Sequence, residues 1–159
     1  MRITLFSVGR LKNGPERELA ERYLSRAAAS GRALGFSGFN NIELSESRAS
    51  RSQDRKAEES REIIAKLGES VLISLDERGK TLNSAAFAET LARLRDAGNS
   101  SLCFVIGGPD GLDETIRAKA IETIAFGAMT LPHQIARIVL SEQIYRALTI
   151  LSGHPYHRV

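Results

Sequence analysis

The chain has 159 residues, 42% of them hydrophobic and 26% charged, so it is long enough to bury one core without a disulfide or a metal. Its lone cysteine, Cys103, lies in an apolar run, and no apolar segment approaches the roughly 20 residues of a membrane helix. The net charge of +3 excludes a strongly basic, non-specific nucleic-acid binder. We expect one domain over residues 1–159 in the cytoplasm, with no membrane contact and no bound metal.

Basic residues are concentrated in the first half, where residues 1–66 hold 13 Lys+Arg and 9 Asp+Glu. One group of cations can follow a phosphate backbone: Arg48, Arg51, Arg55, Lys56 and Arg61. Glu58, Glu59 and Glu62 are interleaved with them, which favours the alternative of a solvated helix face with i,i+4 ion pairs.

The first third of the chain predicts a strand, a helix and a short second strand. Residues 2–8 alternate in polarity and end at Gly9, as a strand does. Pro15 is well placed in the first turn of a helix that runs towards Ala29. A segment rich in glycine and turn residues follows, and we expect a short strand at residues 42–44.

The middle third predicts two helices around one strand. The pattern is helical from Arg51, and Gly68 is a typical helix stop. Residues 71–75 form an apolar strand, which we expect to end in a loop at residues 76–80. Ser84 is the predicted N-cap of the next helix.

The last third begins with an apolar strand at residues 102–106. We expect a helix from Asp113 through Ile124, then a stretch of weak strand character at residues 125–130. Pro132 opens a final helix from His133, which Gly153 and Pro155 end before an irregular tail through Val159. The residues of this helix predicted to be buried are Ile135, Ile138, Val139, Ile144, Leu148 and Leu151, whereas Arg137, Glu142 and Arg146 are expected outside that stripe.

Strands that alternate with helices predict an α/β fold, with a mainly parallel sheet covered by helices on both faces. Ligands of such sheets bind at the carboxyl ends of the strands. Three segments should meet there: residues 75–80, 107–111 and 125–130. The glycine pair Gly107-Gly108 lets backbone approach a ligand closely, although a plain tight turn is the alternative. The usual dinucleotide and phosphate-loop motifs are absent.

Four segments of the last third carry a more specific signal: Ile106-Gly107-Gly108-Pro109-Asp110-Gly111-Leu112, Leu131-Pro132-His133, Tyr145-Arg146-Ala147 and His154-Pro155-Tyr156-His157-Arg158. In this combination the chain resembles the RlmH family, the ribosomal large subunit pseudouridine methyltransferases of the SPOUT superfamily. The resemblance covers the whole length, with its specificity between Leu102 and Arg158.

The resemblance implies a C-terminal trefoil knot, which no pattern in the sequence predicts and which topological rules disfavour. It also implies a homodimer and S-adenosylmethionine as the cofactor. The positions that it assigns to cofactor binding are Leu75, Gly107, Gly108, Ala125, Phe126, Gly127, Ala128, Met129 and Thr130.

The implied reaction is methylation of N3 of a pseudouridine in 23S rRNA of the assembled ribosome. A sulfonium donor needs no acid assistance, so the protein must position the base and remove the N3 proton. The predicted catalytic residues are Tyr156, His157 and Arg158. The proton acceptor stays open, as do the roles of His133, His154, Arg137, Glu142 and Arg146.

Two alternatives differ in what they require. A SPOUT-like methyltransferase acting on tRNA would share the cofactor pocket and differ in the tail. A non-catalytic ribosome-associated factor would use the basic first half and would not bind the cofactor.

Overall fold

The computed structural model describes residues 1–158, so the predicted end of the tail at Val159 lies outside the described residues. Five parallel strands form one sheet in the order β2-β1-β4-β3-β5. The strands are β1 (Arg2–Val8), β2 (Gly38–Leu44), β3 (Val71–Thr81), β4 (Ser101–Ile106) and β5 (Glu122–Ala125). The helices are α1 (Pro15–Gly31), the short 3₁₀ helix η1 (Arg32–Leu34), α2 (Ser52–Leu67), α3 (Ser84–Asp96), α4 (Glu114–Lys119) and α5 (His133–Leu151).

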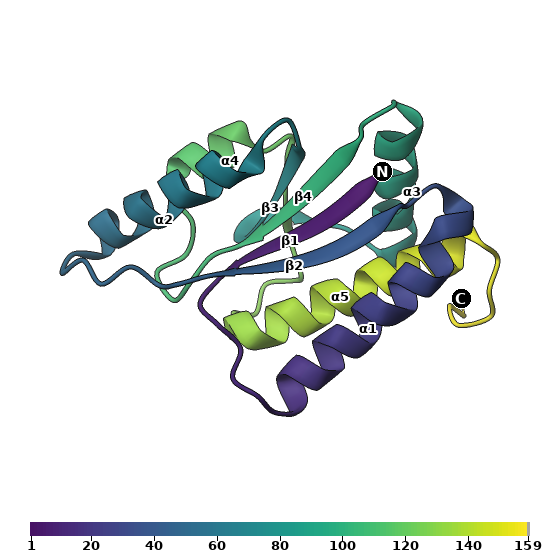
Figure 1. Cartoon of the computed structure of the whole chain (residues 1–159), viewed down its shortest axis with the longest axis horizontal. Helices are drawn as coiled ribbons and strands as arrows, with labels where there is room; N and C mark the ends of the chain where they lie inside the picture. The colour runs from purple at the N-terminus through teal and green to yellow at the C-terminus, as the bar shows by residue number, and fades with distance from the viewer. Residues whose placement is uncertain (159) are drawn as a thin grey trace.

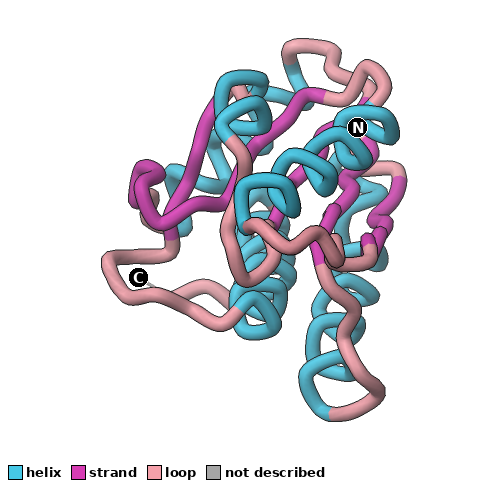
Figure 2. The backbone as a smooth tube through the Cα atoms, turned by 90° about the vertical axis from the view of Figure 1, so that its left-hand side faces the viewer, coloured by secondary structure: helices cyan, strands magenta, loops and turns pink. Residues whose placement is uncertain are grey.

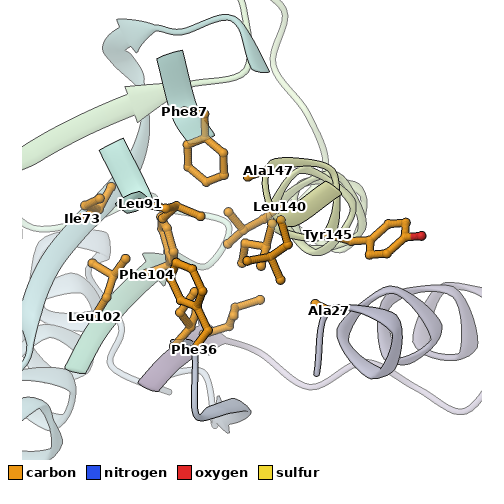
Figure 3. Close-up of a cluster of buried hydrophobic side chains, with 14 of the residues drawn as sticks. Ala27, Phe36, Ile73, Phe87, Leu91, Leu102, Phe104, Leu140, Tyr145 and Ala147 are labelled. Carbon is orange, nitrogen blue, oxygen red and sulfur yellow. The ribbon is translucent and has the colours of Figure 1, made fainter. Parts of the chain in front are cut away.

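Helices cover both faces of the sheet, as the alternating order predicts (Figures 1 and 2). Strand residues alternate between the two layers: Leu102 and Phe104 of β4 pack with α1, α3 and α5, whereas Cys103 and Val105 pack with α2 and α4. In the larger layer, Phe87, Leu91 and Leu140 point towards Phe104 (Figure 3). The α/β prediction with helices on both faces is therefore confirmed.

Most element bounds agree with the sequence patterns, but five predictions were wrong. Strand β2 begins at Gly38, four residues before the predicted start, because β1 pairs with it along its whole length. The cap of α3 is Asn83, whose side chain accepts a hydrogen bond from the N–H of Ala86 at 2.8 Å. Ser84 instead donates its hydroxyl to Gln143 on α5 at 2.8 Å.

The third error concerns the helix predicted from Asp113 through Ile124. Asp113 does cap α4 by accepting from the N–H of Thr115, but the helix ends at Lys119. The β-branched residues Thr123 and Ile124 lie in β5, where they align with Ser74 and Leu75 of β3. Consequently only Ala125 of the predicted weak strand at residues 125–130 is in a strand.

Strand β3 is longer than predicted and includes residues 76–80, which the sequence suggested as a loop. Its register against β5 is irregular, since both Leu75 and Lys80 align with Ile124. At Gly79 the backbones of β3 and β5 approach each other so closely that a Cβ on this residue would lie 2.5 Å from the carbonyl carbon of Ile124. Only glycine fits at this position. The trefoil knot stays a prediction.

Helix α5 departs from its predicted burial pattern. Ile144 and Leu148 are buried as expected, but Ile135 is 40% exposed and Arg137 is only 2% exposed. Helical periodicity predicts that a charged residue such as Arg137 lies on the exposed face. Arg137 is buried instead, because it has hydrogen-bond partners at the ends of β1 and β2. No helix within residues 1–158 is long and apolar enough to cross a bilayer.

Candidate functional site

A cavity of about 710 Å³ opens at the carboxyl ends of β4 and β5, beside residues 75–78 of β3. Its volume lies in the range of small-molecule and cofactor sites. The three segments expected to meet at this edge all line it, which confirms their convergence. The lining residues are Lys56, Leu75, Asp76, Glu77, Arg78, Ile106, Gly107, Gly108, Pro109, Asp110, Gly111, Leu112, Ile124, Ala125, Phe126, Gly127, Met129, Thr130, Leu131, Pro132, His133, Gln134 and Ala136.

Eight of the nine predicted cofactor positions belong to this wall, and Ala128 is the exception. Sequence reasoning missed the contributions of the first turn of α5 and of Lys56 on α2. The Leu131-Pro132-His133 segment could have indicated the contribution of α5, because a helix that starts directly after a wall segment adds its first turn to that wall. Nothing local marks Lys56 as a cavity residue.

The glycine turn after β4 is shaped by close backbone packing. A Cβ at Gly107 would lie 2.8 Å from the carbonyl carbon of Gly111, and one at Gly108 would lie 3.0 Å from Cγ1 of Val8. The N–H of Gly111 donates to the carbonyl of Gly108 at 2.9 Å, which closes the turn. Both glycines are thus required by the turn itself, and the turn leaves backbone rather than side chains facing the cavity.

Helix α2 holds this turn from outside the cavity. Arg55 donates two hydrogen bonds to the carboxylate of Asp110, at 2.7 and 2.9 Å, and a third to the carbonyl of Ala49 at 2.9 Å. The carboxylate of Glu59, 7% exposed, accepts from the N–H of Ser47 at 2.9 Å, and burial raises its pKa. The sequence suggested Arg55 as a phosphate ligand or a solvated cation. In the structure its ion pair with Asp110 connects α2 to the glycine turn.

A second set of ion pairs lies on the β3 side of the cavity. The carboxylate of Asp76 accepts hydrogen bonds from the guanidinium groups of Arg78 at 3.0 Å and Arg117 at 2.9 Å. Burial favours the neutral acid, but these hydrogen bonds outweigh it and lower the pKa of Asp76 to about 2. Asp76 is therefore an ionised residue of the cavity wall, and its ion pair with Arg117 connects β3 to α4.

The last wall segment, residues 126–132, is the most open of the three. Met129 is 82% exposed, and Gly127 has a φ of +123° with no neighbour within 4 Å of a Cβ built there. The hydroxyl of Thr130 donates to Glu77 at 3.5 Å, a long contact between two walls. This segment has the freedom to adjust to a bound molecule.

The first turn of α5 combines a half-buried histidine with a buried arginine. Burial, followed by the charge of Arg137, lowers the pKa of His133, so its imidazole is neutral at pH 7. Arg137 donates to the carbonyls of Val8 at 2.7 Å and Gly9 at 2.6 Å, and to Glu43 at 3.0 Å. It thus ties the start of α5 to the ends of β1 and β2.

The predicted catalytic residues follow the C-terminal end of α5 and fold back along it, and none of residues 154–158 lines the cavity. The hydroxyl of Tyr156 donates to Glu142 at 3.0 Å, and its ring lies 4.8 Å from that of Tyr145. Glu142 also accepts from Arg146 at 2.6 Å, an i,i+4 ion pair on α5. Tyr145 is buried, and Figure 3 shows its ring on the side of α5 that faces α1.

The same end of the helix includes His157, whose Nδ1 lies 3.5 Å from Arg146. Arg158 is exposed. Burial, with hydrogen bonding to Tyr23 and Glu142, raises the pKa of Tyr156, so in this arrangement its phenol is protonated and unsuited to accept a proton. Because α5 rises about 1.5 Å per residue, about 9 Å of helix separates Glu142 from Ala136, the last residue of α5 that lines the cavity, and about 15 Å separates Arg146 from it.

Two further features bear on the expected chemistry. Cys103 is fully buried, and burial raises the pKa of its thiol to about 12, so it is an inert core residue. No group of three or more His, Cys, Asp or Glu side chains within residues 1–158 is placed to hold a metal ion. The prediction that the protein needs no metal stays a prediction.

Comparisons with known proteins agree on one relationship. Residues 1–157 match the family described as "Predicted SPOUT methyltransferase". The chain is similar to the ribosomal RNA large subunit methyltransferase H of Nitrobacter hamburgensis, with 54% identity over 99% of both chains. It is 52% identical to the protein of that name from Agrobacterium fabrum, over the full length of both. A solved probable methyltransferase from Bordetella pertussis shares the fold, with a TM-score of 0.51 at 14% identity over 92% of this chain and 95% of that one.

Proposed function

The chain belongs to the SPOUT methyltransferase family, and from this premise we propose that it methylates N3 of a pseudouridine in 23S rRNA of the assembled ribosome. The single observation that supports the proposal most directly is the cavity formed by Leu75, the glycine turn and residues 125–132. It lies where the family resemblance assigns the cofactor. Full-length relatives that are more than half identical are named as large-subunit rRNA methyltransferases.

The cavity fits S-adenosylmethionine, the methyl donor of the family. Apolar side chains of Leu75, Ile106 and Phe126 suit an adenine ring, and backbone groups of residues 107–111 and 126–131 suit its polar edge. The bound donor supplies a methyl group on a positively charged sulfur, which departs as a neutral thioether. The protein has only to hold the acceptor in line and take up the N3 proton.

The residues proposed for that second task are those of the tail. His157 is a candidate proton acceptor, and Arg158 is a candidate to stabilise negative charge on the base or to bind a phosphate. Within one chain none of these residues lines the cavity, and the contacts of Tyr156 and His157 hold the tail against α5 about 9 to 15 Å of helix beyond Ala136, the last cavity residue of that helix. We therefore propose a homodimer in which the tail of one copy completes the cofactor site of the other.

Transfer of labelled methyl from S-adenosylmethionine to intact ribosomes that lack the modification tests the proposal, with the labelled nucleotide mapped by mass spectrometry. Label on N3 of a 23S pseudouridine supports it. Label on tRNA and none on ribosomes would instead identify a methyltransferase of the same fold with another substrate. Equal methylation of deproteinised 23S rRNA would contradict the requirement for the assembled ribosome.

A further inference from the structure

The loop between β1 and α1, residues 9–14, lies beside the cavity at the same edge of the sheet. Strand β1 is paired with β4, and Val8 at its end contacts the glycine turn, since a Cβ on Gly108 would be 3.0 Å from Val8 Cγ1. Arg137 bonds the carbonyl of Gly9 and is one helical turn beyond His133, which lines the cavity. None of residues 9–14 lines the cavity itself, and the loop therefore lies directly behind its wall.

The backbone of this loop is fixed by a buried ionic network. Glu43 of β2 accepts from the N–H of Leu11 at 2.9 Å, from Arg17 at 2.9 Å and from Arg137 at 3.0 Å. Arg17 also donates to the carbonyl of Leu11, and Gly9 donates to the carbonyl of Leu44 at 2.8 Å. The side chain of Leu11 is only 5% exposed and anchors the middle of the loop.

The two cationic side chains of the loop take no part in this network. Arg10 and Lys12 are exposed, and within residues 1–158 neither forms an ion pair. Glu43 pairs with both Arg17 and Arg137, and the exposed carboxylate of Glu46 adds a second negative charge near Arg137, so these four charges balance. Arg10 and Lys12 are thus an unbalanced pair of positive charges on a fixed loop next to the cofactor site.

From this arrangement we infer that Arg10 and Lys12 bind phosphates of the acceptor RNA and place the target nucleotide at the cavity. The inference rests on the proposed function. A fixed loop costs little conformational entropy when RNA binds, and cations without an internal partner sacrifice no ion pair. Contacts to phosphates set the register of the RNA, whereas selection of the base is left to the cavity and the tail.

The test uses the full-length protein with ribosomes that lack the modification. We expect the double variant Arg10→Gln/Lys12→Gln to raise KM for ribosomes by roughly tenfold with kcat nearly constant, because each lost phosphate contact weakens RNA binding alone. The slope of log(kcat/KM) against log salt should flatten by about 1.4, that is about 0.7 for each of two phosphates. S-adenosylmethionine affinity, measured by calorimetry, should not change.

Three controls separate the possible outcomes. Arg93→Gln removes an exposed cation on α3, remote from the cavity, and should leave KM and the salt slope as in the wild type. Arg10→Lys/Lys12→Arg keeps both charges and should restore KM. The inference would be overturned if the double Gln variant kept the wild-type KM and salt slope, or if it lost only cofactor affinity. The proposed function would still stand in that case, provided that the wild-type protein methylates ribosomes. Wild type that methylates no ribosomes would overturn the proposed function instead.

Discussion

The two ends of α5 divide the site between them. At the His133 end, three loops enclose a cavity whose lining includes the glycine turn, apolar side chains, His133 and the carboxylates of Asp76, Glu77 and Asp110. From the middle of α5 towards Leu151, Tyr156, His157 and Arg146 gather around Glu142, and none of these residues lines that cavity. Under the proposed function, the His133 end holds the cofactor and the tail cluster serves the acceptor base. The tail of a single copy does not line its own cavity, so the proposed homodimer unites the two.

The most severe way to break this division is to disrupt the cavity. We expect Gly107→Arg to reduce methyl transfer below about 1% of wild type and to abolish cofactor binding, because a Cβ there lies 2.8 Å from the backbone of Gly111 and the larger side chain distorts the turn that lines the cavity. Gly38→Arg on β2 is the matched control, since a Cβ there has no neighbour closer than 3.7 Å. Calorimetry with S-adenosylmethionine and the ribosome assay measure both effects. Full cofactor affinity in Gly107→Arg would place the site elsewhere.

The next prediction joins the two ends in different copies. Removing Pro155 to the end of the chain should abolish transfer while cofactor binding persists, because the cavity is built without the tail. If each site takes its tail from the partner, mixing this variant with Gly107→Arg under conditions of subunit exchange should restore roughly a quarter of wild-type activity, since half of the dimers are mixed and carry one intact site of two.

Each variant alone, carried through the same exchange, is the control for that experiment. A mixture that stays inactive, although mixed dimers are shown to form, would mean that each tail serves its own cavity. The division between the two ends of α5 would then have to be bridged by movement within one chain.

The two ends also differ in how they contribute to stability. Arg137 is 2% exposed and bonds two carbonyls and Glu43, so we expect Arg137→Met to lower the free energy of unfolding by about 3 kcal/mol. Arg146→Met is the matched control at the other end, where the ion pair with Glu142 is partly exposed and should contribute less than about 1 kcal/mol. Denaturant unfolding of both variants measures the difference. Equal losses would show that the tail cluster is as integral to the fold as the cavity end.

The cavity end was the more predictable of the two, because its signals are local. A buried strand that runs into Gly107-Gly108, and Pro132 before a helix, are patterns within a few residues. The partners of Arg137 lie 94 to 129 residues away in sequence, so helical periodicity alone placed this charge on the wrong face. The prediction of a helix through Ile124 was wrong for a similar reason, because Thr123 and Ile124 pair with β3 at the sheet edge and form β5. The tail residues were proposed from family resemblance, and their distance from the cavity is a property of the fold that no local pattern contains.

The smallest expected effect concerns the ion pairs of Asp76 in the cavity wall and their response to pH. The pKa of Asp76 in the folded protein, about 2, lies below its ordinary value of 3.8, so the ionised carboxylate favours the folded state above pH 4. We expect Asp76→Asn to lower the free energy of unfolding by about 2 kcal/mol at neutral pH. Since protonation removes this contribution from the wild type, the difference between the two proteins should shrink as pH falls from about 4 towards 2. Asp96→Asn, in an exposed pair with Arg95, is the control and should change stability little at any pH. If the difference in unfolding free energy between Asp76→Asn and the wild type did not depend on pH, Asp76 would act through packing. Its ion pairs would then not be what holds β3 at the cavity.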